Sequence, residues 1–280
     1  MKETKSIKCF IDVASAHAWF AFEALLNEKA KQNFKLDFVP VHAASVMTTI
    51  GHKMPYYDKI LRDYNFYDIK VETKSIKCFI DVASAHAWFA FEALLNEKAK
   101  QNFKLDFVPV HAASIMTTIG HKMPYYDKIL RDYNFYDIKV VDKMYGVNIN
   151  VPSNGIDRLS NIGTFNAMRF ASAVKETDPE RYEATCRKLF QRLWSEDKEI
   201  YQRQDFEEVG RDVKLDNQVF EILDDSKWTI QVKKNNEVAI SLGCFGVPWI
   251  QVEKSHEFEC FFGADRIPLI KKYLQVESAN

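Results

Sequence analysis

The chain contains a long internal repeat, and this repeat limits what it can fold into. Residues 3–71 and 72–140 form one 69-residue unit in tandem, and the two copies differ only at Val46 and Ile115. Everything after Val140 occurs once. If the unit needs the C-terminal half to complete a domain, one copy has no partner. Two copies are also too few for a solenoid, which needs at least about three repeats to be stable.

The size of the chain fits one large or two ordinary domains. Its 280 residues include 47% hydrophobic residues and five tryptophans, which is typical of a packed globular protein. The formal net charge of −1, with both signs spread along the sequence, argues against a protein that binds nucleic acid by electrostatic attraction. Without the first copy, 72–280 has the size of one ordinary domain.

The five cysteines indicate a reducing, intracellular environment. They are widely spaced, and no pair has the C-x-x-C spacing of a zinc ribbon or a thioredoxin-type redox centre. The first residues lack the apolar stretch of a secretory signal, and the last three are not a strong peroxisomal signal. The longest nearly apolar stretch, 83–95, is too short to cross a bilayer. We therefore expect no membrane partner.

The first half of the second copy predicts a strand–helix–strand unit. Residues 76–82 form a short β-rich apolar run, and 84–99 carry apolar residues at helical spacing. Residues 105–110 form a second apolar run. Strands joined through a helix in this way are expected to be parallel.

A run of helices separates this unit from two further strands. We expect helices at 124–145, 165–174, 179–194, 206–213, 217–223 and 235–242, then strands at 249–252 and 258–262, and a last helix at 265–274. In the first of these helices, Ile129, Leu130 and Tyr133 share one side. The order β-α-β … β-β-α is an α/β, thioredoxin-like fold with a helical insertion at about 120–235.

The first copy supplies only half of such a sheet. We therefore expect 72–280 to be the complete domain and 1–71 to be an extra, incomplete βαβ segment that precedes it. The first copy ends inside the helix expected after Pro55, and independent domains are not joined within an element. The alternative is a genuine repeat of two domains.

Ser84 is the first candidate for chemistry. It lies where the first strand of the second copy meets the first helix, and the free N–H groups of a helix N-terminus favour a thiolate or another anion. The serine adds one hydroxyl donor. The sequence there is Ser84-Ala85-His86-Ala87, so this turn offers no thiol for disulfide exchange. The alternative is that Ser84 only caps the helix.

Two short segments near the C-terminus complete the candidate site. In thioredoxin-like folds, a cis-proline faces the first helix end, and Gly246-Val247-Pro248 precedes a strand as that proline does. The alternative is an ordinary turn. Asp265 follows the last strand in Gly263-Ala264-Asp265-Arg266, where it either caps the last helix or holds the ammonium group of a ligand.

The histidines near this site do not predict a metal centre. His86 and His121 have no neighbouring residues at the spacing of metal ligands, so we expect no metal.

Five ordered segments together resemble the kappa class of glutathione transferases, within the DsbA-like thioredoxin superfamily. The segment 79–88 is similar to the F-D-V-x-S-P-Y-S-W segment of that class, and 166–170 and 193–200 to its two insertion-helix signatures. Residues 245–248 and 262–266 are similar to F-G-[LV]-P and F-G-S-D-R. The resemblance covers 76–275 and leaves the first copy as an addition.

The resemblance implies a glutathione site and a role for each matching residue. Ser84 would be the catalytic hydroxyl that stabilises the thiolate, with Ala85 and His86 lining the same loop. His121 matches an asparagine that contacts glutathione, and the backbone of Val247 would pair with the cysteinyl part. Ala264 and Asp265 match a Ser-Asp pair that holds the γ-glutamyl end. This chain departs from the class pattern at four of these positions, which are Ala85 for proline, His86 for tyrosine, His121 for asparagine and Ala264 for serine.

We therefore expect a kappa-like glutathione transferase that conjugates the glutathione thiolate to small electrophiles. Glutathione would be a substrate, and no cofactor would be bound permanently. The resemblance implies a homodimer in mitochondria or peroxisomes, with the cytoplasm as the alternative. Two rivals are a glutathione-dependent isomerase of the 2-hydroxychromene-2-carboxylate type and a non-catalytic, glutathione-binding or vestigial protein.

Overall fold

The computed structural model of the chain divides into two compact units, Met1–Glu72 and Thr73–Asn280. The described residues are 6–12, 16–31, 35–41, 74–155, 158–159, 163–254 and 257–275.

The first unit is a small strand–helix–strand element. Strand β1 (Ser6–Ile11) and strand β2 (Lys35–Pro40) are parallel and joined through helix α1 (Ala16–Lys31). Ser6 pairs with Lys35 in this sheet. Because the equivalent residues of the second copy, Ser75 and Lys104, pair in the same way, the two copies share one strand register.

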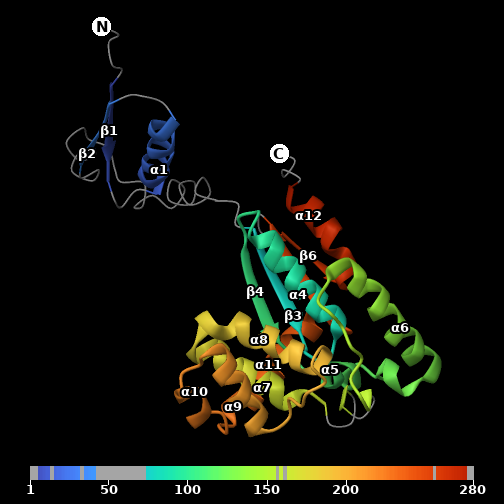
Figure 1. Cartoon of the computed structure of the whole chain (residues 1–280). Helices are drawn as coiled ribbons and strands as arrows, with labels where there is room; N and C mark the ends of the chain where they lie inside the picture. The colour runs from blue at the N-terminus through green and yellow to red at the C-terminus, as the bar shows by residue number, and fades with distance from the viewer. Residues whose placement is uncertain are drawn as a thin grey trace. The chain divides into compact units, whose positions relative to one another are not determined.

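The second unit contains a four-stranded mixed sheet in the order β4-β3-β5-β6 (Figure 1). Its strands are β3 (Ser75–Ile80), β4 (Lys104–Pro109), β5 (Trp249–Lys254) and β6 (Glu257–Phe262). Strands β3 and β4 are parallel and connected through helix α4 (Ala85–Lys98), whereas β5 is antiparallel to both of its neighbours. The predicted thioredoxin-like order β-α-β … β-β-α is confirmed.

A large helical insertion lies between β4 and β5. Its elements are α5 (Ala112–Thr118), a 3₁₀ turn η2 (Pro124–Tyr126), α6 (Lys128–Tyr145), α7 (Phe165–Thr177), α8 (Pro179–Trp194), α9 (Arg203–Val213), α10 (Gln218–Glu221) and α11 (Lys227–Ser241). After β6 come η4 (Ala264–Arg266) and α12 (Ile267–Gln275). Figure 1 shows α7 to α11 gathered into one helical group within this unit, with α6 apart from that group.

The side chains of β3 point alternately to the two faces of the sheet and pack into two separate hydrophobic clusters. Ile76, Cys78 and Ile80 belong to a large cluster that includes the buried side of α4. Phe79 faces the other way and packs with Val108 in a second, smaller cluster. The insertion is fixed to the first cluster, because the ring of Trp88 on α4 stacks on Phe190 of α8 at 5.8 Å with an interplanar angle of 4°.

Three details differ from the sequence-based expectations. Helix α5 was not predicted, because its seven residues are too few to show a clear period. Helix α11 begins at Lys227 rather than at 235, since burial of Trp228 and Val232 stabilises a stretch with several β-branched residues. The helix expected at 124–145 begins only at Lys128, after the separate turn η2. The side that carries Ile129, Leu130 and Tyr133 is exposed, and Ile138 is the buried residue.

Candidate functional site

Ser84 lies at the N-terminus of α4, and its hydroxyl takes part in two hydrogen bonds. The oxygen accepts from the backbone N–H of Ala87 at 3.2 Å, so Ser84 is the N-cap of the helix. The hydroxyl also donates to the carbonyl oxygen of Val247 at 3.2 Å. Ser84 therefore does cap the helix, as the alternative proposed. The same side chain also binds the backbone of Val247, the residue before Pro248.

The first two amides of α4 are available to a ligand. The N–H groups of Ala87 and Trp88 both donate to Ser84. Helix geometry leaves the N–H groups of Ala85 and His86 without an intrahelical acceptor. These two amides and the Ser84 hydroxyl form a small set of donors at the positive end of the helix dipole.

Asp81 holds the turn that presents Ser84. Its carboxylate is buried and accepts from the backbone N–H of Ala83 at 3.0 Å and of Ala112 at 2.8 Å. It also accepts from the hydroxyl of Thr164. The start of α5 and the start of α7 are thus tied to the loop between β3 and α4. Sequence reasoning did not single out Asp81, because its partners lie far along the chain.

A cavity of about 550 Å³ lies beside this helix end. Residues from α4, α6, the loop before β5, and the segment from β6 to α12 line it: His86, Asn134, Asp137, Val141, Met144, Tyr145, Val247, Pro248, Phe262, Gly263, Ala264, Asp265 and Pro268. The Val247–Pro248 bond is cis, the isomer expected from the sequence. Five residues expected at the site, His86, Val247, Pro248, Ala264 and Asp265, therefore come together around one cavity.

A smaller recess of about 130 Å³ contains Ser84. It shares His86, Asn134, Val247 and Phe262 with the larger cavity. The rest of its wall is mostly apolar: Ala83, Ala85, Ala112, Met116, Met123, Tyr125 and Gly246. The two hollows thus meet at His86 and Val247, and the larger one alone is also lined by the carboxylates Asp137 and Asp265. Such a pairing suits a polar ligand beside a small apolar one.

His86 carries the titratable group that both hollows share. Its Nε2 lies 3.7 Å from Oδ2 of Asp137 on α6. Partial burial lowers the pKa of His86 below its ordinary value, while the negative charges of Asp137 and Asp265 act to raise it. The larger cavity therefore holds two carboxylates and a histidine that burial favours in its neutral form.

Ala264 and Asp265 lie in different environments. Ala264 is buried, and its carbonyl oxygen accepts from the Tyr145 hydroxyl at 3.0 Å. Asp265 is exposed, lies 3.5 Å from the Arg266 guanidinium, and belongs to η4, the turn directly before α12. Its carboxylate is thus able to meet a ligand at the rim of the cavity.

The structure places His121 outside both hollows. The residue is exposed in the loop after α5, where its backbone N–H donates to the Met116 carbonyl oxygen at 2.8 Å. Asn134 on α6 instead supplies a side-chain amide to both hollows. Sequence reasoning missed Asn134, Asp137 and Tyr145, because in this helix it singled out only the side that carries Ile129, Leu130 and Tyr133.

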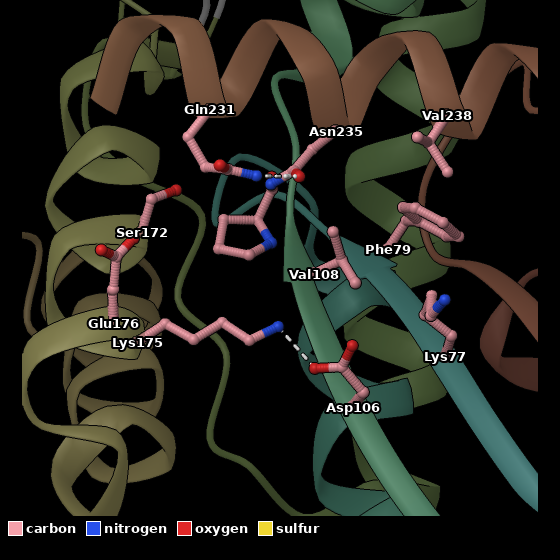
Figure 2. A pocket seen from close by; sticks show the side chains of 11 residues that line it. Lys77, Phe79, Asp106, Val108, Ser172, Lys175, Glu176, Gln231, Asn235 and Val238 are labelled. Atoms are coloured by element: carbon pink, nitrogen blue, oxygen red, sulfur yellow. Dashed lines mark hydrogen bonds and ion pairs between the residues drawn. The ribbon is translucent and has the colours of Figure 1, made fainter. Parts of the chain in front are cut away.

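A separate cavity of about 380 Å³ lies between β3, β4, α7 and α11, on the face of the sheet that carries Phe79 (Figure 2). Its polar groups are largely paired within the protein. Lys175 donates to Asp106 at 2.5 Å, and Asn235 donates to the Pro109 carbonyl oxygen at 2.8 Å. Glu176 pairs with Lys227 at 2.6 Å. We assign this cavity no chemistry.

Two other classes of site are absent from the described residues. Within them, no group of three or more His, Cys, Asp or Glu side chains is arranged to hold a metal ion. Among the helices of the described ranges, none is both long and apolar enough to cross a membrane.

Comparison with known proteins agrees with this fold. Residues 75–275 match the DSBA-like thioredoxin domain. Glutathione S-transferase kappa 1 of Homo sapiens is 27% identical over 205 residues, which are 72% of this chain and 91% of the human protein. The kappa 1 protein of Caenorhabditis elegans is 28% identical over 204 residues, covering 71% and 90% of the two chains.

Two solved structures have the same fold. The structure of 2-hydroxychromene-2-carboxylate isomerase matches with a TM-score of 0.60 at 18% identity, over 71% of this chain and 94% of that one. The cytosolic disulfide reductase DsbM from Pseudomonas aeruginosa with GSH matches with a TM-score of 0.52 at 12% identity, over 72% and 100%.

Proposed function

This chain belongs to the DSBA-like thioredoxin domain family, and we propose that it is a kappa-like glutathione transferase that conjugates the glutathione thiolate to small electrophiles. Its relatedness to the kappa transferases supports a glutathione-transferase-like function. The observation that carries the proposal is the position of Ser84, whose hydroxyl lies at the N-terminus of α4 and beside Val247. Disulfide exchange at this position is disfavoured, because Ser84-Ala85-His86-Ala87 has no thiol.

Glutathione would lie along the larger cavity. Its γ-glutamyl ammonium group would meet the Asp265 carboxylate, beside Ala264. Its cysteinyl backbone N–H would donate to the Val247 carbonyl oxygen in strand-like fashion. That carbonyl now accepts from Ser84, and because the serine hydroxyl has only one proton, it would give up this bond in order to donate to the sulfur atom.

The chain would lower the pKa of the glutathione thiol. The Ser84 hydroxyl and the N–H groups of Ala85 and His86 would donate to the sulfur, and the helix dipole favours its negative form. The thiol proton leaves to water. The thiolate then attacks an electrophilic carbon, a C–S bond forms, and the leaving group departs with the electron pair of the broken bond.

The apolar recess would hold the second substrate. Met116, Met123 and Tyr125 are part of its lining, and its volume of about 130 Å³ favours a small electrophile. Flexible methionine side chains accept several apolar shapes. The test is turnover of glutathione with a series of aromatic chlorides of increasing size. Activity that falls as the ring system grows supports this placement, and activity independent of size contradicts it.

The isomerase is the second candidate, since an isomerase has the same fold. Isomerisation of a 2-hydroxychromene-2-carboxylate in the presence of glutathione, without conjugation of aromatic chlorides, would favour it. A non-catalytic protein would bind glutathione and turn over neither substrate. A calorimetric titration with glutathione and the two activity assays together separate these outcomes.

We also propose a homodimer, in keeping with the family resemblance. The apolar side chains of α6 that face solvent in the single chain support it: Ile129, Leu130, Tyr133, Tyr136 and Met144. Asn134 and Asp137 of the same helix line the larger cavity, so this contact would lie next to the site. Leu130→Glu is expected to make residues 73–280, which lack the first copy, monomeric when their mass is measured by light scattering after gel filtration.

A further inference from the structure

Strand β1 has an open edge in the described part of the chain. The sheet of the first unit contains only β1 and β2 there. The identical six residues of β3 have neighbours on both sides, because β4 pairs in parallel and β5 pairs antiparallel from Ser75–Glu253 to Phe79–Trp249. The sequence Ser-Ile-Lys-Cys-Phe-Ile is therefore able to accept an antiparallel strand along the edge that β1 leaves open.

The first unit also exposes apolar side chains that the second unit buries. Phe10 is 63% exposed and Trp19 is 62% exposed, whereas their counterparts Phe79 and Trp88 are 0% and 2% exposed. A two-stranded sheet with one helix is only marginally stable by itself in water. An open strand edge next to exposed aromatic side chains is a place where another chain binds.

We propose that the first unit is a self-association module in which β1 pairs antiparallel with β1 of a second copy of this chain. The other partner for this edge would be β5 of a second copy. That strand already lies between β3 and β6, so capturing it would break as many strand pairs as it forms. A β1–β1 pair breaks no strand pair that the described residues form, and it closes about a twofold axis into a sheet β2-β1-β1-β2.

Symmetry and charge fix the register of this pair. A twofold antiparallel pair places residues of the same strand face opposite each other, so the central pair is either Lys8 with Lys8 or Cys9 with Cys9. The first arrangement sets like charges directly opposite, which is destabilising. The pair therefore forms with Cys9 opposite Cys9 and Ile7 opposite Ile11. Directly opposite Cα atoms in antiparallel strands are about 4.5–5.5 Å apart, within the range of a disulfide.

Oxidation of the full-length chain tests this arrangement. With copper phenanthroline, two Cys9 thiols would give up two electrons and two protons to the oxidant and form one intermolecular disulfide. We expect a covalent dimer on a non-reducing gel, and Cys9→Ser is expected to abolish it. Cys78→Ser is the matched control, because Cys78 is the buried counterpart of Cys9, and Cys260→Ser controls for another partly exposed thiol. Both controls are expected to keep the dimer.

Sedimentation velocity under reducing conditions provides a readout that does not depend on register. The full chain is expected to show a concentration-dependent association step beyond any that residues 73–280 show, and that fragment contains the complete matched domain. Equal association of the two proteins would overturn the proposal. So would a covalent dimer that persists undiminished in Cys9→Ser.

Discussion

The Ser84 hydroxyl donates a hydrogen bond of 3.2 Å to the carbonyl oxygen of Val247, a residue 163 positions away in the sequence. This bond joins the start of α4 to the loop before β5 and occupies the two groups that we propose for the sulfur and the cysteinyl backbone of glutathione. Ligand binding at this site would replace the bond rather than add to it.

Removing the Ser84 hydroxyl is expected to lower turnover. Ser84→Ala should reduce kcat with glutathione and an aromatic chloride by at least roughly tenfold, the scale of one charge-assisted hydrogen bond to the thiolate. Ser15→Ala, at the corresponding position of the first copy, is the matched control and should leave kcat unchanged. Turnover by Ser84→Ala at the original rate, with Ser15→Ala also silent, would refute the assignment.

Asp81 is expected to stabilise the second unit through its buried hydrogen bonds. Asp81→Ala leaves the N–H groups of Ala83 and Ala112 and the hydroxyl of Thr164 without their acceptor. We expect a loss of about 2–4 kcal/mol in the free energy of unfolding, measured by urea denaturation of residues 73–280 or of the full chain. The matched control is Asp12→Ala, its counterpart in the first copy. This substitution should not change the urea concentration at the midpoint of the main unfolding transition of the full chain.

The pKa of His86 should respond to the acidic residues around it. Because burial lowers this pKa while Asp137 and Asp265 raise it, Asp137→Asn should lower it further, and Asp265→Asn should do so by a smaller amount. An NMR titration of the His86 ring measures both shifts. Asp132→Asn, an exposed position on the same helix, serves as control, and an equal shift there would contradict the role of Asp137.

The lowered pKa of His86 also predicts how the free energy of unfolding varies with pH. A histidine with a lowered pKa in the folded state binds its proton more readily when unfolded, so the folded state loses stability as pH falls through the ordinary value of about 6.5. The loss stops once pH is below the folded-state pKa, where both states are protonated. The free energy of unfolding of His86→Asn should lack this part of the pH dependence. An unchanged pH profile would show that His86 does not cause it.

Much of the site follows from the order of elements along the sequence. The strand–helix turn of a thioredoxin-like fold predicts Ser84, and the segment before β5 predicts Val247 and Pro248, because the topology brings these turns together. The residues from α6 could not be predicted in the same way. Periodicity locates this helix but does not decide which stripe packs inward, and Ile129 and Tyr133 are exposed while Asp137 faces the cavity.

Asp81 illustrates a second limit of the sequence. Its role depends on Ala112 and Thr164, which lie 31 and 83 positions further along the chain, and neither spacing carries a local pattern. His121 illustrates a third. The resemblance implies its role through one matching family position, and in this fold that position lies in an exposed loop outside the two hollows, both of which Asn134 lines.

The two nearly identical copies should differ in their resistance to protease, and this difference tests which of them belongs to the active domain. The matched family domain begins at residue 75, and the boundary between the compact units falls after Glu72. Phe79 and Trp88 are buried in the second unit, whereas Phe10 and Trp19 are exposed in the first, so the first copy lacks the packing that protects its counterpart. Because nicking follows poorly packed segments, limited trypsin should cut first near residues 70–74 and leave a fragment of about 210 residues.

That fragment should retain the glutathione activity of the full chain, because Ser84, Val247 and Asp265 all lie within it. Mass spectrometry of the protected fragment identifies the cut, and the activity assay on the same sample reports its function. A protected fragment that keeps the first copy and has lost the second would reverse the assignment. Loss of activity in step with removal of the first copy would show that the catalytic domain needs both.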